Sequence, residues 1–349
     1  MCIIQTIVRL GLLRVIELTP DNTAKISELT QRHRWAASDI DSLTVAGAGN
    51  MNRTFRAQLS AGGTLILKQA VDHVAKYPQI PAPIERARVE ADFYAAVSSQ
   101  PAVADRMPKL LGYDETNRIL CLGDLGGGGD LTSIYPHESG GRRAASAEVV
   151  RGLIDWLSLL HALPPPNAFP TNRGMRELNH EHIFDLPFAA ATHEMVGTEF
   201  GPRTLRRAAA IASDTALKHA ADALGEIYLG EAPHASQPAL LHGDYYPGSW
   251  LEVDGAVFVL DPEFAFVGPA EFDVGVLIAH LCFAQLELDT IDDLLTHYRA
   301  PEQFSRALAN RFAGVELIRR LLGVAQLPLP NDDDAKAAWL DIGRRLLSG

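Results

Sequence analysis

In the first third of the chain, hydrophobic and polar residues alternate in the way that half-buried β-strands require. Residues 43–59 contain an apolar strand, a turn rich in Gly and Asn, and an alternating second strand. Residues 64–70 (TLILKQA) and 118–125 (RILCLGDL) continue the strand pattern. Between them, residues 84–99 repeat apolar side chains at helical spacing. We therefore predict a small β-rich unit that carries one helix.

Beyond the glycine run Gly126–Gly129 and a polar stretch that extends to about residue 141, the pattern becomes helical. Residues 146–163 and residues 203–227 are each long and periodic, and we predict a helix over each of them. A short apolar strand at residues 238–242 then leads to residues 251–264, which resemble a β-hairpin. Further helices are expected up to the end of the chain.

These two patterns predict an α+β fold with two lobes. The expected N-terminal lobe spans residues 1–122, and residues 1–35 of it form a helical extension. The expected C-terminal lobe spans residues 123–349 and is mainly helical. We expect the hairpin, with the loops beside it, at the seam between the lobes.

The chain is acidic, and this narrows the range of partners. Its 349 residues include 43 Asp and Glu against 31 Lys and Arg, which gives a formal net charge of −12. Because phosphate binding requires a basic face, a nucleic-acid partner is disfavoured. Only six of the basic residues are Lys, and none of them follows a Gly, so the sequence has no G-x-x-x-x-G-K-[ST] phosphate loop. A nucleotide would have to be bound by other means.

The cysteines and the N-terminal segment bear on the compartment. Cys2, Cys121 and Cys282 are far apart and form no CxxC pair, which favours a reducing cytoplasm. Residues 1–18 are apolar but charged at three positions, and they lack a basic leader and a small-residue cleavage site, so we expect no signal peptide. We expect them to form an amphipathic helix or to be poorly ordered. No uncharged run approaches the roughly 20 residues that span a bilayer, so we expect a cytoplasmic protein.

Two carboxylates stand at strand ends with a spacing that suits phosphoryl transfer. Asp244 closes an HGD triplet where an apolar strand ends, and Asp261 opens a DPE triplet 17 residues later, at the end of the next strand. Two such carboxylates, joined by a short hairpin, can face one cleft. In kinases, one Asp accepts the proton of the attacking hydroxyl and the other holds the magnesium that bridges the phosphates. The alternative is a turn and a strand terminator, which either triplet alone would favour.

The β-rich lobe contains the other groups that a nucleotide kinase without a Walker loop requires. Residues 47–52 (GAGNMN) can form a hairpin over the phosphates. Lys68 ends the following strand, and Glu90 lies on the next helix, where a carboxylate can orient the lysine. The alternatives are a solvated lysine at a strand edge and a glutamate on a helix surface. The order of these features along the chain favours a kinase.

Over about residues 43–325, these motifs resemble those of the aminoglycoside phosphotransferase and choline kinase-like superfamily, and within it the methylthioribose kinases. GNMNRTF resembles their phosphate loop, and LILKQA with ERARVE resembles their lysine strand and helix. HGDYYPGS, DPEFAFVGPAEFDVG and GVELIRRLLGVAQ resemble their catalytic loop, metal-binding segment and late helix with paired arginines. The DPEFAF segment and the arginine pair are the specific parts. The resemblance implies a bilobal, protein kinase-like α+β fold.

The resemblance also implies roles for the residues around the two triplets. Asp244 would be the catalytic carboxylate that faces the acceptor hydroxyl. Asp261 would be the principal magnesium ligand, with Glu263 helping to hold the metal. Ser249 stands where most of the superfamily has a magnesium-binding Asn. Because a hydroxyl is a weaker metal ligand than an amide carbonyl, we expect Glu263 to compensate.

A further set of residues is implied in binding ATP. Lys68 would contact the α- and β-phosphates, with Glu90 as its ion-pair partner. The backbone of the glycine hairpin would cover the phosphates, and the strand at residues 120–124 would hydrogen-bond adenine through its backbone. The residues implied in this binding are Gly47, Gly49, Asn50, Asn52, Lys68, Glu90, Leu122 and Asp124.

Two adjacent pairs of residues are implied at the acceptor. Arg319 and Arg320 resemble the twin arginines near the substrate and the γ-phosphate, where guanidinium groups suit oxygen-rich ligands. Adjacent helical residues point about 100° apart, so we expect only one of them to face the cleft while the other forms a structural pair. Tyr245 and Tyr246 stand where the family has Leu and His, and an aromatic pair can stack on a sugar.

Three other features are interpreted as structural. Asp273 is expected to brace the catalytic loop, and His242 is expected to be a structural histidine. Residues 179–182 (NHEH) carry two imidazoles without the H-E-x-x-H spacing of a zinc site. We interpret them as a loop or the start of a helix.

We predict an ATP- and Mg-dependent phosphotransferase that acts on a hydroxyl of a small sugar-like molecule. The leading acceptor is S-methyl-5-thioribose at its anomeric hydroxyl, a step of methionine salvage. Two alternatives stay open: a kinase of another small alcohol or amino sugar, and a catalytically inactive nucleotide-binding pseudokinase. We expect ATP and a small acceptor as partners, neither nucleic acid nor a membrane, and leave a homodimer open.

Overall fold

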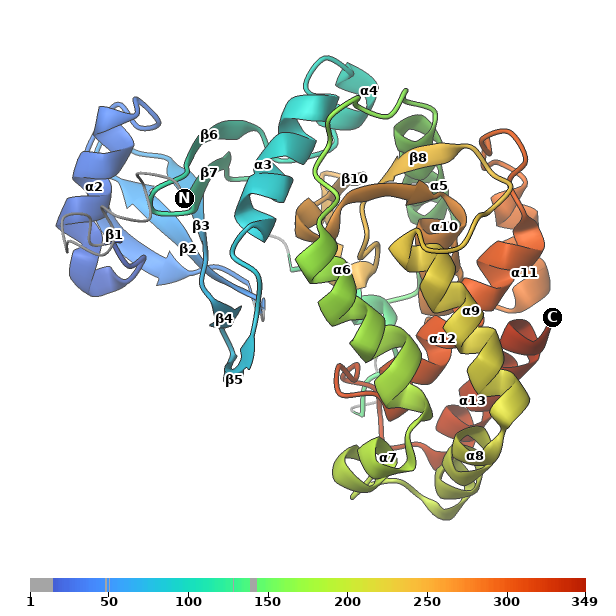
Figure 1. The fold of residues 1–349 in the computed structure, drawn as a ribbon. Helices are drawn as coiled ribbons and strands as arrows, with labels where there is room; N and C mark the ends of the chain where they lie inside the picture. The colour runs from blue at the N-terminus through green and yellow to red at the C-terminus, as the bar shows by residue number, and fades with distance from the viewer. Residues whose placement is uncertain (1–14, 48, 50, 128, 139–142) are drawn as a thin grey trace, which may run out of the picture. The chain divides into compact units, whose positions relative to one another are not determined.

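The computed structural model forms two compact units (Figure 1). The first unit contains the chain up to Tyr94 together with Pro108–Gly126, and the second contains Ala95–Met107 and Gly127–Gly349. The expected amphipathic helix at the N-terminus falls largely outside the described residues. The structure describes residues 15–47, 49, 51–127, 129–138 and 143–349.

The division differs from the expected boundary between residues 122 and 123. The first unit continues to Gly126, and the segment Ala95–Met107 belongs to the second unit. Hydrogen bonds explain this second difference. The indole Nε1 of Trp156 donates to the carbonyl oxygen of Val103 (3.3 Å). The backbone N–H of Val259 donates to the carbonyl oxygen of Arg106 (2.8 Å).

The first unit is built on a five-stranded antiparallel sheet with the strand order β1-β2-β3-β7-β6. This confirms the predicted strands and the helix that follows them, and it adds the strand β6. The sheet strands are β1 (Ile40–Val45), β2 (Asn52–Leu59), β3 (Thr64–Ala70), β6 (Leu110–Asp114) and β7 (Ile119–Gly123). A separate ribbon pairs β4 (His73–Val74) with β5 (Tyr77–Pro81). The helices are a 3-10 turn (Pro20–Asn22), α2 (Thr23–Arg32) and α3 (Arg86–Val97), and the last three residues of α3 fall in the second unit.

Strand alternation divides the side chains of this sheet between two apolar clusters. Leu67 of β3 belongs to the cluster that Leu29 of α2 completes. Ala70 of β3 belongs to the other cluster, together with Ala87 of α3. Successive residues of a strand point to opposite faces of the sheet. Lys68, next to Leu67 and two residues before Ala70, therefore points to the face that α3 covers.

The second unit is mainly helical (Figure 1). It holds two small antiparallel sheets, which pair β8 with β11 and β9 with β10. Its helices are α4 (Pro101–Ala104), α5 (Ala147–His161), α6 (Arg173–His180), α7 (Ala190–Val196), α8 (Pro202–Ser213), α9 (Thr215–Leu229), α10 (Glu271–Phe283), α11 (Leu288–Leu295), α12 (Arg306–Leu322) and α13 (Asp333–Ser348). Its strands are β8 (Pro238–Leu241), β9 (Trp250–Val253), β10 (Ala256–Val259) and β11 (Phe266–Pro269), and its short turns are 3-10 helices at Leu131–Ile134, Leu186–Phe188, Pro247–Ser249 and Pro262–Phe264 and a π-helix at Glu181–Asp185.

Helix α10 lies at the centre of the second unit. Every residue from Glu271 to Phe283 is buried, and α12 packs against both α10 and α13. A Cβ atom added at Gly275 of α10 would lie 2.6 Å from the Cβ of Phe312 on α12, so the glycine permits the close approach of these two helices. Within the described residues, no helix is both long enough and apolar enough to cross a membrane.

The predicted helix over residues 146–163 is confirmed by α5, and the predicted strand and hairpin are confirmed by β8, β9 and β10. The prediction of a single helix over residues 203–227 is wrong. Helices α8 and α9 meet at Asp214, whose backbone leaves the helical region (φ −87°, ψ 91°). Its side chain accepts a hydrogen bond from the backbone N–H of Leu217 (3.0 Å). Such an N-cap satisfies a free donor of the first turn and begins a new helix.

Candidate functional site

Asp244 lies in a loop after β8 that a second carboxylate holds in place. The carboxylate of Asp273, on α10, accepts hydrogen bonds from the backbone N–H groups of His242 (2.7 Å) and Gly243 (3.0 Å). The ring Nε2 of His161 lies 3.3 Å from the same carboxylate. The side chains of Asp273, His161 and His242 are all buried. This confirms the prediction that Asp273 braces the loop.

Gly243 permits the tight turn that presents Asp244. Its φ angle is +83°, in the left-handed region that favours glycine. A Cβ atom at this position would lie 2.2 Å from the carbonyl oxygen of Phe264, so a side chain would collide with the backbone of the segment after Asp261. The turn therefore depends on the absence of a side chain.

The buried ring of His242 joins the two segments that bear the predicted carboxylates. Its Nε2 lies 2.7 Å from the carbonyl oxygen of Leu260, and its Nδ1 accepts from the backbone N–H of Asp244 (3.3 Å). These partners require the tautomer with the proton on Nε2. The backbone N–H of Leu260 also donates to the carbonyl oxygen of Ser249 (2.8 Å). One imidazole thus ties Asp244 to the residue before Asp261, and the prediction of a structural histidine is confirmed.

Both arginines of α12 reach Asp244. The Oδ1 atom of Asp244 lies 3.4 Å from a terminal nitrogen of Arg319 and 3.2 Å from one of Arg320. Glu316, on the same helix, accepts hydrogen bonds from the Nε atoms of Arg319 (2.5 Å) and Arg320 (2.8 Å). The prediction that only one arginine faces the site is wrong. The side chains of Arg319 and Arg320 leave the helix in different directions, but the carboxylate of Glu316 binds both and holds their guanidinium groups on one side.

A chain of buried polar groups stands behind the arginine pair. The Nε2 of His280 lies 3.1 Å from Glu316, and its Nδ1 lies 2.6 Å from the hydroxyl of Tyr135. Burial lowers the pKa of His280 to about 4. Burial would raise the pKa of Glu316, but the charges of Arg319 and Arg320 outweigh it and hold that pKa well below its usual value. A neutral imidazole therefore donates from Nε2 to a charged carboxylate and accepts at Nδ1 from the tyrosine.

This chain of groups was not among the predicted site residues. Glu316 precedes the two arginines by three and four residues, a spacing at which helical side chains meet, so its pairing could have been found. His280 and Tyr135 carried no such signal, because they lie 145 residues apart and meet only in the folded unit.

Tyr245 is a core residue. Its side chain is fully buried, its hydroxyl donates to the carbonyl oxygen of Leu153 (3.0 Å), and its ring stacks on Trp156 with centroids 5.5 Å apart and planes inclined by 4°. The prediction that Tyr245 contacts the acceptor is therefore wrong. The hydroxyl and the ring are both used inside the unit.

Tyr246, in contrast, is half-buried and lies among charged groups. The guanidinium carbon of Arg320 lies 4.7 Å from its ring centroid, within the range of a cation–π contact. Burial raises the pKa of Tyr246; the charge of Asp244 raises it further, that of Arg320 opposes the rise, and that of Asp261 adds to it. Asp244 and Asp261 thus both act on one hydroxyl, although they are 17 residues apart in the chain.

The residues predicted to hold magnesium offer hard oxygen donors. Asp261 is half-buried, with φ at +60°, and Glu263 and Ser249 are buried. The hydroxyl of Ser249 donates to the carbonyl oxygen of Asp244 (3.2 Å). In the part of the chain that the structure describes, no three His, Cys, Asp or Glu side chains are placed to hold one metal ion. One or two carboxylates are nevertheless the usual protein share for magnesium that also binds phosphate oxygens, so the donor set fits.

In the first unit, Lys68 and Glu90 form the predicted ion pair. The Nζ of Lys68 lies 2.7 Å from Oε2 of Glu90, and both side chains are buried. Strand alternation points Lys68 to the face that α3 covers, and α3 carries Glu90. The pairing is thereby confirmed.

The glycine hairpin is fixed at its end by an arginine that the sequence analysis missed. Gly47 has φ at +74°, which a turn before β2 requires. Asn52 is buried, and its Oδ1 accepts a hydrogen bond from Nε of Arg86 (3.1 Å). A terminal nitrogen of the same guanidinium group donates to the carbonyl oxygen of Met51 (2.8 Å). Asn50, a predicted ATP contact, lies outside the described residues.

The predicted adenine contact fails at Leu122. In the sheet, Leu122 lies opposite Ile66 of β3 on one side and Leu110 of β6 on the other. The N–H and C=O groups of an internal strand face its neighbours, so Leu122 has no backbone group to offer adenine. The side chain of Asp124 pairs with Arg56 (2.6 Å); burial would raise the pKa of Asp124, but this hydrogen bond helps to lower it below its usual value. A backbone contact at Asp124 stays a prediction.

Residues 179–182 end α6 and begin the π-helix, so the expected loop or helix start is wrong. The ring of His180 packs against Gly225, where an added Cβ would lie 2.4 Å from its Nε2.

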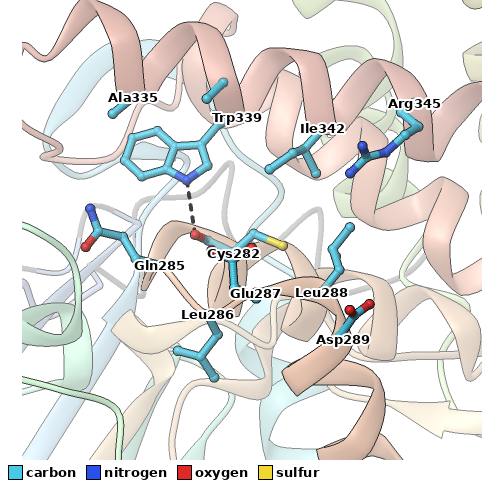
Figure 2. A pocket seen from close by; sticks show the side chains of 11 residues that line it. Cys282, Gln285, Leu286, Glu287, Leu288, Asp289, Ala335, Trp339, Ile342 and Arg345 are labelled. Atoms are coloured by element: carbon cyan, nitrogen blue, oxygen red, sulfur yellow. Dashed lines mark hydrogen bonds between the residues drawn. The ribbon is translucent and has the colours of Figure 1, made fainter.

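A groove of about 730 Å³ lies between α13 and the segment that joins α10 to α11, and its lining includes Cys282 and Trp339 (Figure 2). No predicted site residue lines this groove.

Residues 42–308 match the phosphotransferase enzyme family, and the chain belongs to this family. The methylthioribose kinase of Yersinia enterocolitica is 28% identical over 243 residues, which cover 67% of this chain and 58% of that protein. The methylthioribose kinase of Cronobacter sakazakii is 28% identical over 289 residues, which cover 80% of this chain and 66% of that protein. The chain thus spans less than two thirds of the length of these relatives.

Solved structures of phosphotransferases resemble the chain over almost its whole length. The choline kinase of Streptococcus pneumoniae gives a TM-score of 0.53 at 11% identity and covers 93% of this chain and 99% of its own. A spectinomycin phosphotransferase in complex with ADP and spectinomycin gives a TM-score of 0.52 at 11% identity, with coverages of 93% and 97%. At these identities the likeness shows the fold, and it confirms the predicted kinase-like α+β class.

Proposed function

We propose that this chain transfers the γ-phosphoryl group of ATP to a hydroxyl of a small sugar-like molecule, with S-methyl-5-thioribose as the leading acceptor. The observation that carries the proposal is the pair of guanidinium groups at the carboxylate of Asp244, which itself sits in a buried, braced loop. Membership in the phosphotransferase enzyme family supports the reaction class.

In the proposed reaction, Asp244 accepts the proton of the acceptor hydroxyl as that oxygen attacks the γ-phosphorus, and the bond from this phosphorus to the oxygen of the β-phosphate breaks, so that ADP leaves. A positioned general base of this kind contributes about 10²- to 10⁴-fold to a rate. Arg319 and Arg320 stabilise the negative charge on the transferring phosphoryl oxygens, because guanidinium groups bind such oxygens with fixed geometry. The two guanidinium groups, which contact the carboxylate of Asp244 in the structure, then also contact the phosphoryl oxygens of the substrate.

The first unit supplies contacts to the nucleotide. Lys68 binds the α- and β-phosphates, and Glu90 keeps the ammonium group oriented. The backbone of the hairpin at residues 47–52 covers the phosphates, and its end is fixed by the bond from Arg86 to Asn52. ATP and a small acceptor are the proposed partners, and a cytoplasmic location stays a prediction.

Asp261 would hold a magnesium ion, with Glu263 and Ser249 as further oxygen donors. When bound, the ion supplies positive charge to the phosphates and to the leaving group. Ser249 directs its proton to the carbonyl oxygen of Asp244, which leaves its lone pairs free to serve as donors to a metal.

Two observations bear on the choice of acceptor. The named relatives are methylthioribose kinases, which favours methylthioribose. The net charge of −12 favours a cationic acceptor such as an amino sugar or amino alcohol, since acidic surfaces attract cations. A catalytically inactive protein is disfavoured by the intact Lys68–Glu90 pair and by the ordered surroundings of Asp244.

The experiment is an assay of magnesium-ATP consumption over methylthioribose, amino sugars and amino alcohols. Turnover with methylthioribose supports the proposal in full. Turnover with another class alone keeps the reaction and replaces the acceptor. Binding of magnesium-ATP without turnover on the whole panel would favour the inactive alternative.

A further inference from the structure

One buried carboxylate next to the proposed site has no part in the reaction as described. Glu316 lies one turn before the arginine pair on α12, and 2% of its side chain is exposed. It binds the Nε atom of Arg319 through Oε2 and that of Arg320 through Oε1. Each oxygen therefore holds one arginine.

We propose that Glu316 is a positioning residue for phosphoryl transfer, which locks Arg319 and Arg320 into one unit that faces Asp244. The inference rests on the proposed function, and it adds a residue that acts through the arginines without touching the substrate. The hydrogen bonds divide the guanidinium groups in two: the Nε atoms belong to Glu316, and the terminal nitrogens point to Asp244.

The charges explain why this division needs a carboxylate. Arg319 and Arg320 are both nearly buried, and two guanidinium groups held side by side repel each other. Glu316 and Asp244 supply two negative charges that balance them. If Glu316 were neutral, Asp244 alone would face two positive charges, and a buried charge without a partner is costly. One arginine would then turn toward solvent or pair with Asp244 more closely, and the site would lose its geometry.

The orientation of Glu316 is itself fixed from behind. The neutral ring of His280 lies with Nε2 3.1 Å from Oε1 of Glu316, and the hydroxyl of Tyr135 lies 2.6 Å from Nδ1 of the same ring. Tyr135 and His280 are fully buried. The ring of Tyr246 covers the guanidinium group of Arg320 from another side (4.7 Å). The arginine pair is thus held on several sides before any substrate is present.

The decisive variant is Glu316→Gln, which keeps the shape and removes the charge. We expect kcat to fall by about 100-fold or more, as when a transition-state donor is lost, while the KM for ATP changes little, because Lys68 and the hairpin bind the nucleotide. Glu316→Asp keeps the charge on a shorter stem and should recover part of kcat. Tyr135→Phe removes only the hydroxyl behind His280, so it should fold well and give a smaller loss.

A matched control comes from another buried glutamate of the same unit. Glu271 is fully buried, and its carboxylate accepts hydrogen bonds from the hydroxyl of Ser236 (2.8 Å) and the backbone N–H of Ser305 (2.8 Å). Glu271→Gln should lower the Tm, because a buried carboxylate is lost, but the folded protein should keep its kcat. A shared loss of kcat in both variants would assign Glu316 a merely structural role and overturn the proposal.

A second measurement does not depend on turnover. In ¹⁵N-arginine NMR spectra, the buried Nε–H groups of Arg319 and Arg320 should give two slowly exchanging signals, which Arg319→Lys and Arg320→Lys assign. Both signals should shift and exchange faster in Glu316→Gln and stay unchanged in Glu271→Gln. If the wild type turns over no acceptor, the proposed function fails, and these signals alone decide: a shift with faster exchange in Glu316→Gln supports the positioning of the arginines by Glu316, and unchanged signals overturn it. Folded Glu316→Gln protein with the kcat of the wild type also overturns it.

Discussion

The Nζ atom of Lys68 lies 2.7 Å from the Oε2 atom of Glu90, and only 4% of the lysine side chain and 1% of the glutamate side chain are exposed. Two buried charges of this kind lose their hydration, and each depends on the other for compensation. Burial of a charged lysine against α3 is therefore costly for the fold, and Lys68 is one of only six lysines in the chain. We attribute its presence to nucleotide binding.

Lys68→Met should impair the use of ATP. We expect kcat/KM for ATP to fall by about 10²- to 10³-fold, the loss typical of one electrostatic donor. We expect the protein to lose about 3–5 kcal/mol of stability, because the buried carboxylate of Glu90 loses the positive charge beside it. Steady-state kinetics at varied ATP and urea denaturation measure the two effects. Lys109→Met, at an exposed lysine of the same unit, is the control. Wild-type ATP kinetics in Lys68→Met would refute the nucleotide role.

Gly243 should be far less tolerant of alanine than Gly255. Both have positive φ angles, +83° and +79°, so an L-residue costs roughly 1 kcal/mol at either position. Only at Gly243 would the added Cβ meet an atom, 2.2 Å away in the backbone of Phe264, whereas nothing lies within 4 Å at Gly255. We therefore expect Gly243→Ala to lower the free energy of unfolding clearly more than Gly255→Ala does. Chemical denaturation of both variants gives the comparison, and equal losses would contradict the described turn.

The stability of the protein should fall as the pH decreases through the window set by His280. Its pKa is lowered to about 4 from 6.5, so between these values the unfolded chain binds a proton that the folded chain does not. Stability therefore rises with pH across this window, by on the order of 3 kcal/mol for this one group. Glu316, whose pKa is lowered, loses its contribution only at lower pH.

Denaturation curves of the wild type and of His280→Gln, recorded over the same pH range, isolate this effect. A glutamine cannot take up the proton, so the variant should lose less stability between pH 6.5 and 4. Other acids and bases are common to both proteins and cancel in the difference of slopes. Parallel curves would mean that the His280 site takes up its proton equally well in the folded and unfolded chain.

The parts of the structure that follow a period were predictable from the sequence. Alternation gave β2 and β3, and with them the face on which Lys68 lies; the helix after them then placed Glu90 opposite. The strand-end positions of Asp244 and Asp261 followed from the same logic. These features depend on the local spacing of apolar residues, which can be read from the sequence.

At the candidate site, the wrong predictions concern contacts that no period fixes. Tyr245 and Tyr246 are identical neighbours in a loop, where no alternation tells which one points inward; the fold buries Tyr245 against Trp156 and leaves Tyr246 beside Arg320. Leu122 was excluded from adenine binding by β6, a strand that was not predicted. The arginine pair converges because of Glu316, and helix geometry alone predicts that it diverges.

The central claim is that Asp244 is the base of a phosphoryl transfer to methylthioribose, and one measurement tests it most directly: ³¹P NMR of the product formed from magnesium-ATP and methylthioribose by the wild type, by Asp244→Asn, and by Asp254→Asn at the exposed hairpin turn. We predict a phosphorylated anomeric hydroxyl with the wild type and with Asp254→Asn. Asp244→Asn should still bind ATP but form product about 10²- to 10⁴-fold more slowly. Equal product formation by Asp244→Asn, or no product from methylthioribose with the wild type, would contradict the account.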